Sequence, residues 1–123
     1  MMTPRWIVCE RSSRWAAAVR VALARQSPCD AAPQSLDEVR NLADLTARLH
    51  EFPSSLALLE VTLKNFDATL AWLSETTRRS SHMRAAALLD HGFSDNRAEV
   101  ATALREAGAA EVVLSPRQLQ PVL

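Results

Sequence analysis

Cysteine and glycine are scarce in this 123-residue chain, which contains two of each. The cysteines, Cys9 and Cys29, form no Cys-x-x-Cys pair, so neither a disulfide framework nor a zinc site is indicated. So few glycines exclude a collagen-like chain. No apolar run approaches the roughly 20 residues that span a bilayer, and the apolar stretch near the N-terminus is too short for a secretion signal. We therefore expect a cytoplasmic protein that does not insert into membranes.

An excess of charge of either sign is missing as well. Fourteen Lys and Arg residues balance fourteen Asp and Glu residues, so the formal net charge is zero. This balance argues against a general electrostatic hold on nucleic acid. Hydrophobic residues make up 48% and charged residues 23%, the proportions of an ordinary globular protein. The length suits a single domain over residues 1–123.

Apolar runs typical of buried strands alternate with amphipathic segments typical of helices. The runs predict strands at 6–9, 35–40, 56–61, 84–89 and 111–114, of which 35–40 is polar and suits a sheet edge. The helical segments lie around 15–23, from 42 to just before Pro53, over 67–79, and from about 96 to 107. This alternation predicts an α/β fold with a doubly wound, five-stranded parallel sheet in the order 2-1-3-4-5.

Capping residues support several of these boundaries. Asn41, with Asp44 three residues later, is expected to cap the second helix. Ser94 or Asp95 is expected to cap the fourth helix, and Gly108 follows that helix where a left-handed backbone favours glycine. Only seven residues follow Pro116, so the last helix is expected to be shortened.

Functional residues of such a sheet gather where the parallel strands end. In this chain those positions hold Cys9, Glu10 and Arg11 after the first strand, Glu60 at the third, Asp90 and His91 after the fourth, and Ser115 and Pro116 after the fifth.

Three segments around these positions resemble the response-regulator receiver domain. Residues 58–67, LLEVTLKNFD, are similar to the receiver segment LLDxxxPxxDG, and residues 106–116, EAGAAEVVLSP, are similar to the receiver ending EAGAxxYLxKP. Residues 7–10, IVCE, stand where receivers have their first strand and its acidic pair. The resemblance covers nearly the whole chain and implies a receiver-like (CheY-like, flavodoxin-like) fold.

The resemblance also implies that the residues that handle phosphate are replaced. A receiver is phosphorylated on an Asp that ends its third strand, where this chain has Glu60. Glu10 matches the second acid of the Mg²⁺-binding pair, whereas the first is Cys9. The remaining matched positions are Asp90 for a Thr or Ser, Ser115 for a Lys that precedes the matching Pro116, and Val112 for an aromatic switch residue. We therefore expect a degenerate receiver, or pseudo-receiver, that does not carry out phosphotransfer and is not an enzyme.

Other interpretations of these residues remain open. The carboxylates of Glu10, Glu60 and Asp90 suit a hard divalent cation, which makes a metal-driven switch the alternative function. Glu60 also suits a fixed imitation of a phosphorylated Asp. Cys9 stands between a strand and a helix, a setting that lowers a thiol pKa in some enzymes, although a buried structural cysteine is the favoured interpretation of this position.

These observations favour a regulatory or signalling domain that works through contacts with a protein partner, with no cofactor, metal, nucleic acid or membrane. A shortened last helix leaves part of one sheet face uncovered, and a symmetric homodimer would bury that face.

Overall fold

A computed structural model describes residues 5–12, 14–26, 35–80, 82–89, 93 and 95–119. Its five strands form one sheet in the order β2-β1-β3-β4-β5, and every neighbouring pair is parallel. The strands are β1 (Arg5–Cys9), β2 (Ser35–Val39), β3 (Leu56–Val61), β4 (Arg84–Leu89) and β5 (Glu111–Val113). The predicted fold class and strand order are therefore confirmed, including the polar strand β2 at the edge of the sheet.

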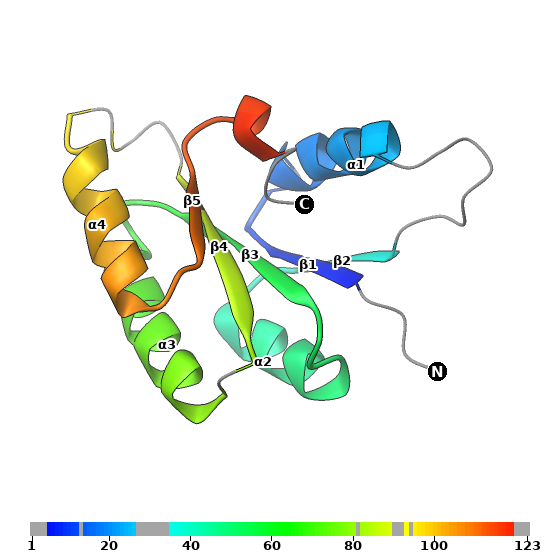
Figure 1. The fold of residues 1–123 in the computed structure, drawn as a ribbon, viewed down its shortest axis with the longest axis horizontal. Helices are drawn as coiled ribbons and strands as arrows, with labels where there is room; N and C mark the ends of the chain where they lie inside the picture. Colours follow the sequence, from blue (N-terminus) through cyan, green and yellow to red (C-terminus); the bar gives the residue numbers. More distant parts are fainter. Residues whose placement is uncertain are drawn as a thin grey trace.

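The helices lie in two layers on either side of this sheet (Figure 1). α1 lies on one side together with the short 3-10 helix η2 (Pro116–Gln118), and α2, α3 and α4 lie on the other. The bounds of the α-helices are α1 (Arg14–Gln26), α2 (Leu42–Glu51), α3 (Phe66–Arg79) and α4 (Arg97–Ala107). None of the helices in the described ranges has the length and apolar character that a bilayer crossing requires.

Alternate residues of each strand enter the two cores because successive side chains point to opposite faces of a sheet. In β3, Leu58 packs with α1, whereas Leu59 packs with α2, α3 and α4. The α1 layer contributes Trp15, Val19 and Leu23 to its core. Because both faces are covered, β3 and β4 are apolar along nearly their whole length, which explains why the sequence predicted them well.

One expectation about coverage is wrong for the described residues. The sheet residues on the α1 side near β5 are buried, including Leu88 and Val113 at 0% exposure. Leu119, which directly follows η2, is also fully buried and belongs to the same core. The described residues after β5 form the short helix η2 and reach Leu119, and the apolar face beneath them is not open.

Helix ends confirm some predicted caps and correct one. The side chain of Asn41 accepts a hydrogen bond from the Asp44 N–H at 2.8 Å, as predicted. The N-cap of α4 is Asn96, not Asp95, and its side chain makes no capping bond. Ser94, the other predicted cap, lies outside the described residues. The sequence was misleading here because several consecutive polar residues precede α4 and any of them suits a cap.

Gly108 ends α4 with φ at +128°, a backbone conformation that side chains with a Cβ rarely adopt. Its N–H donates to the carbonyls of Leu104 and Arg105. A Cβ at this position would lie 2.7 Å from Oγ1 of Thr77 on α3. The left-handed turn and the close approach of α3 therefore both require glycine.

We predict that Gly108→Ala lowers the free energy of unfolding by about 1–3 kcal/mol, through backbone strain and the clash with Thr77. Urea denaturation measures the change. The same substitution in a Thr77→Ala background removes most of the clash, so the loss relative to Thr77→Ala reports mainly the backbone strain. Equal stability of Gly108→Ala and the wild type would contradict the requirement for glycine at this position.

Candidate functional site

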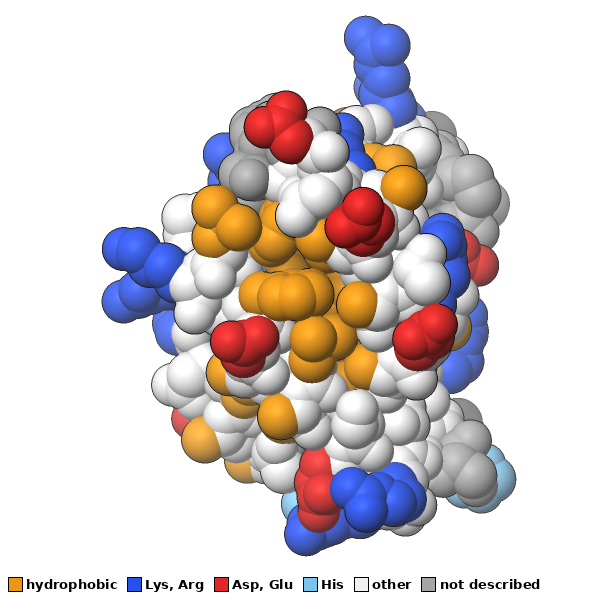
Figure 2. All heavy atoms as spheres, turned by 90° about the vertical axis from the view of Figure 1, so that its left-hand side faces the viewer, with side chains coloured by type: hydrophobic (Ala, Val, Ile, Leu, Met, Phe, Trp, Pro, Cys, Tyr) orange, Lys and Arg blue, Asp and Glu red, His pale blue; other side chains and the backbone are white. Residues whose placement is uncertain are grey.

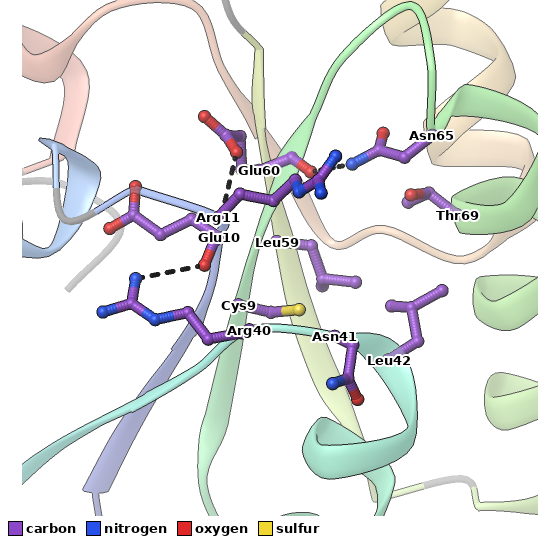
Figure 3. A pocket seen from close by; sticks show the side chains of 10 residues that line it. All are labelled: Cys9, Glu10, Arg11, Arg40, Asn41, Leu42, Leu59, Glu60, Asn65 and Thr69. Carbon is purple, nitrogen blue, oxygen red and sulfur yellow. Dashed lines mark hydrogen bonds between the residues drawn. The ribbon is translucent and has the colours of Figure 1, made fainter.

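A pocket of about 280 Å³ opens at the edge of the sheet where β1, β2 and β3 end. Parallel strands bring their carboxyl ends to the same edge, so residues far apart in the sequence meet there. Figure 3 shows the lining residues, which are Cys9, Glu10, Arg11, Arg40, Asn41, Leu42, Leu59, Glu60, Asn65 and Thr69. Of the residues expected at the site, the structure brings together Cys9, Glu10, Arg11 and Glu60.

The other expected residues lie elsewhere or cannot be placed. Val112 is buried in β5 within the core that faces α2, α3 and α4. Ser115 is the N-cap of η2, and Pro116 is its first residue. Neither Val112 nor Ser115 lines the pocket. Asp90 and His91 lie outside the described residues.

The carboxylate of Glu10 is directed at α1 and not into the pocket (Figure 3). One oxygen accepts a hydrogen bond from the Trp15 N–H at 2.9 Å, and the other accepts one from the Ala16 N–H at 2.6 Å. These N–H groups belong to the first turn of α1, where no carbonyl of the helix can accept from them. Glu10 therefore caps α1 from a position four residues before the helix begins.

Burial disfavours the charged form of the Glu10 carboxyl group. Glu10 is only 2% exposed, and burial raises the pKa of its carboxyl group above the ordinary value. The two backbone hydrogen bonds lower this pKa and oppose the rise, whereas the charges of Glu60 and Glu38 add to it. Its carbonyl oxygen also accepts a hydrogen bond from the Arg40 guanidinium at 3.3 Å. Backbone N–H groups of α1 thus hold the carboxylate of Glu10, and the Arg40 side chain holds its backbone carbonyl.

Cys9 directs its thiol to the apolar side of the pocket, near Leu59 and Leu42 (Figure 3). Its side chain is buried, and burial raises the pKa of the thiol to about 11, with the charge of Glu60 adding to the effect. A thiol with this pKa stays protonated at neutral pH and is a poor nucleophile. The structural interpretation of Cys9 is therefore favoured over the enzymatic one.

Glu60 lies near the mouth of the pocket, in the next-to-last position of β3. Its Oε1 accepts a long hydrogen bond, 3.5 Å, from the Arg11 N–H. Its carbonyl accepts from the side-chain amide of Asn65 at 3.0 Å, and the Asn65 side-chain oxygen accepts from the Thr62 N–H at 2.8 Å. Asn65 thereby fixes the turn between β3 and α3, and with it the position of Glu60.

Three polar lining residues, Arg40, Asn65 and Thr69, were not predicted from the sequence. The Asn65 pattern was readable in principle, because an asparagine just before a helix commonly bonds to nearby backbone. No local signal marks Arg40, since it reaches Glu10 across thirty positions of the chain.

A metal site is not assembled within the described ranges. No group of three or more His, Cys, Asp or Glu side chains there has an arrangement that could hold a metal ion. Both carboxylate oxygens of Glu10 are already engaged by α1. The metal-switch alternative therefore depends on Asp90, which is not described, and it stays a prediction.

We predict that the Cys9 thiol resists alkylation at neutral pH. In a Cys29→Ser variant, Cys9 is the only thiol, so an alkylating reagent reports on it alone. The native protein should react far more slowly at pH 7 than the same protein unfolded in urea, and the native rate should rise as the pH approaches about 11. A native rate at pH 7 equal to the unfolded rate would show that the thiol is accessible and that its pKa is not raised.

Comparisons with known proteins identify the fold of the chain but no family. No family model and no curated protein matches the chain. Among solved structures, a CheY-like protein (tadZ) from Pseudomonas aeruginosa PAO1 aligns with a TM-score of 0.72 at 14% identity, covering 98% of this chain and 96% of that one. A response regulator from Thermotoga maritima aligns with a TM-score of 0.74 at 14% identity over 98% and 94%.

A third structure, a putative pilus assembly-related protein from Burkholderia pseudomallei K96243, aligns with a TM-score of 0.65 at 13% identity. The alignment covers 97% of this chain and 85% of that one. These similarities extend over almost the full length of the chain, and they agree with its strand order and helix layers. The chain has the fold of a CheY-like receiver domain.

Proposed function

We propose that this chain is a non-catalytic receiver-like domain that accepts no phosphoryl group and acts through contacts with other proteins in signalling or regulation. The observation that carries the proposal is the orientation of Glu10. In the receiver resemblance, Glu10 is the one remaining acid of the Mg²⁺-binding pair. Here both of its carboxylate oxygens accept hydrogen bonds from the first turn of α1. Binding a cation would break this cap and leave two N–H groups without an acceptor.

The neighbouring positions support the same conclusion. Cys9 replaces the other acid of the pair with a protonated thiol, whereas a hard cation such as Mg²⁺ prefers oxygen ligands. Glu60 extends its carboxylate one methylene farther than an Asp would, and misplacement by about 1 Å is enough to remove most of the rate of a positioned reaction.

Residues that would respond to a phosphoryl group are also replaced. Ser115 carries no positive charge at the position that matches the receiver Lys. Val112 is a buried aliphatic side chain at the position that matches the aromatic switch residue. This argues against Glu60 as an imitation of a phosphorylated Asp, because no described residue at the matched positions would respond to its charge.

A role in protein contacts is consistent with the proteins that share this fold. One is described as a response regulator, and another as putatively related to pilus assembly. We propose that this chain likewise acts as a docking domain, either within a regulatory pathway or within a larger assembly.

Incubation with Mg²⁺ and acetyl phosphate, followed by intact mass measurement, tests the proposal. We expect no phosphoryl adduct on the wild type, while a receiver with an intact acceptor Asp, treated in parallel, becomes modified. A stoichiometric, acid-labile adduct on the wild type would overturn the proposal.

The Glu60→Asp variant is the matched control. It restores the acceptor side chain but leaves Glu10 on α1 and Ser115 uncharged, so we expect it to remain unmodified as well. Phosphorylation of this variant would show that Glu10 is free to bind Mg²⁺, and that the central observation of the proposal is wrong.

A further inference from the structure

The solvent-exposed side of α1 is apolar and basic. Ala17, Val21 and Ala24 follow one another at intervals of four and three residues, so they share one side of the helix. All three are exposed, and Val21 is 53% exposed. Arg14 and Arg25 lie on the same side, at the two ends of the helix. We call this surface, made of Arg14, Ala17, Val21, Ala24 and Arg25, the α1 face.

Within the described part of the chain, no acidic residue balances the charge of the α1 face. The sequence of α1, RWAAAVRVALARQ, contains no acidic residue. Arg20 pairs with Glu38 of β2, but neither Arg14 nor Arg25 forms an ion pair with any residue that the structure describes. The α1 face therefore exposes apolar side chains between two uncompensated positive charges.

A second apolar surface lies over α3 and α4. Figure 2 shows this side of the molecule, where hydrophobic side chains gather at the centre and acidic side chains are the charged groups nearest to them, although both helices also contain arginines. Leu70 and Ala71 of α3, with Ala103 and Ala107 of α4, are at least partly exposed apolar residues of these helices. We call these four residues the α3–α4 patch.

Exposed acidic residues border the α3–α4 patch. They are Asp67 of α3 and Glu99 and Glu106 of α4. By helical spacing, Glu99 and Glu106 lie on the same side of α4 as Ala103. None of these three carboxylates forms an ion pair within the described part of the chain. The patch is thus apolar at its centre and negative at its border.

We propose that the α1 face of one copy of this chain docks on the α3–α4 patch of a second copy. The two surfaces complement each other in charge, and each exposes apolar area that contact would remove from water. Small side chains predominate on both surfaces, which lets the helices approach closely. They cannot meet within one chain, because α1 and the α3–α4 pair lie at opposite ends of the molecule (Figure 1).

The charged residues of the two surfaces are spaced along their helices so that they can reach one another. Arg14 and Arg25 are eleven residues apart, which is about 16 Å along α1, and Glu99 and Glu106 are seven residues apart, which is about 10 Å along α4. The long, flexible arginine side chains span the difference. The acidic border of the α3–α4 patch would repel an acidic partner, so the patch suits a basic surface such as the α1 face.

A contact between two different surfaces has a specific consequence for assembly. It leaves one α1 face and one α3–α4 patch unused at the ends of every open oligomer, so copies continue to add until a ring closes or a filament forms. A symmetric dimer, in contrast, uses the same surface twice and stops at two copies. This inference does not depend on the absence of phosphotransfer, and either proposal can fail without the other.

Sedimentation velocity of two complementary variants tests the contact. Val21→Glu with Arg25→Glu blocks the α1 face, and Glu99→Lys with Glu106→Lys blocks the α3–α4 patch. All four positions are exposed, so the fold should be retained, which circular dichroism can verify. The wild type should form progressively larger species as its concentration rises, and added salt should shift it back toward monomer because salt screens the charges.

Each blocked variant alone should remain monomeric. An equimolar mixture should form a complex of two chains and no larger species, because each variant supplies the surface that the other has lost. Glu51→Lys, an exposed charge reversal on α2, is the matched control and should assemble like the wild type. A wild type that stays monomeric, a symmetric dimer, or a mixture that fails to associate would each overturn the proposal. If the patch instead takes a different basic protein, the wild type remains monomeric and the proposal fails in the same way.

Discussion

The architecture of the candidate site depends on how the first turn of α1 is satisfied. The N–H groups of Trp15 and Ala16 have no acceptor within the helix, and a loop of few residues connects β1 to α1. Glu10 supplies both acceptors from the end of β1. The same two bonds set the start of α1 and withdraw the carboxylate from the pocket. A residue that resembles part of a metal site is therefore used here as a structural cap.

The distribution of charged residues over the surface matters more for this molecule than its net charge. The formal net charge is zero, yet α1 contains only basic charged residues, and the apolar centre over α3 and α4 is bordered by acidic ones. The parallel sheet keeps these surfaces apart, because α1 covers one face and α2, α3 and α4 cover the other. In the function proposed above, the phosphate site of the receiver fold has lost its chemistry, whereas its two helical layers are retained as surfaces suited to protein contacts.

Elements governed by local pattern could be predicted from the sequence, and those governed by long-range contacts could not. The apolar run of β3 and the Asn41 cap both follow from a few adjacent residues. The alternation of strands and helices predicts the parallel sheet, and 2-1-3-4-5 is a common order that five such strands fit. The direction of Glu10 could not be predicted, because a carboxylate at a strand end suits a cation, a cap or solvent equally. Arg40 was missed because its partner is thirty positions away. The Asn96 cap was missed because neighbouring polar residues give the same signal.

The most direct test of the central claim is to observe the α1 amide groups while Mg²⁺ is added. In an NMR titration, the amide resonances of Trp15 and Ala16 report on the carboxylate that accepts from them. If Glu10 is committed to α1, both resonances should stay in place up to millimolar Mg²⁺. A saturable shift of both resonances would show that a cation competes for Glu10, and would contradict its role as a structural cap.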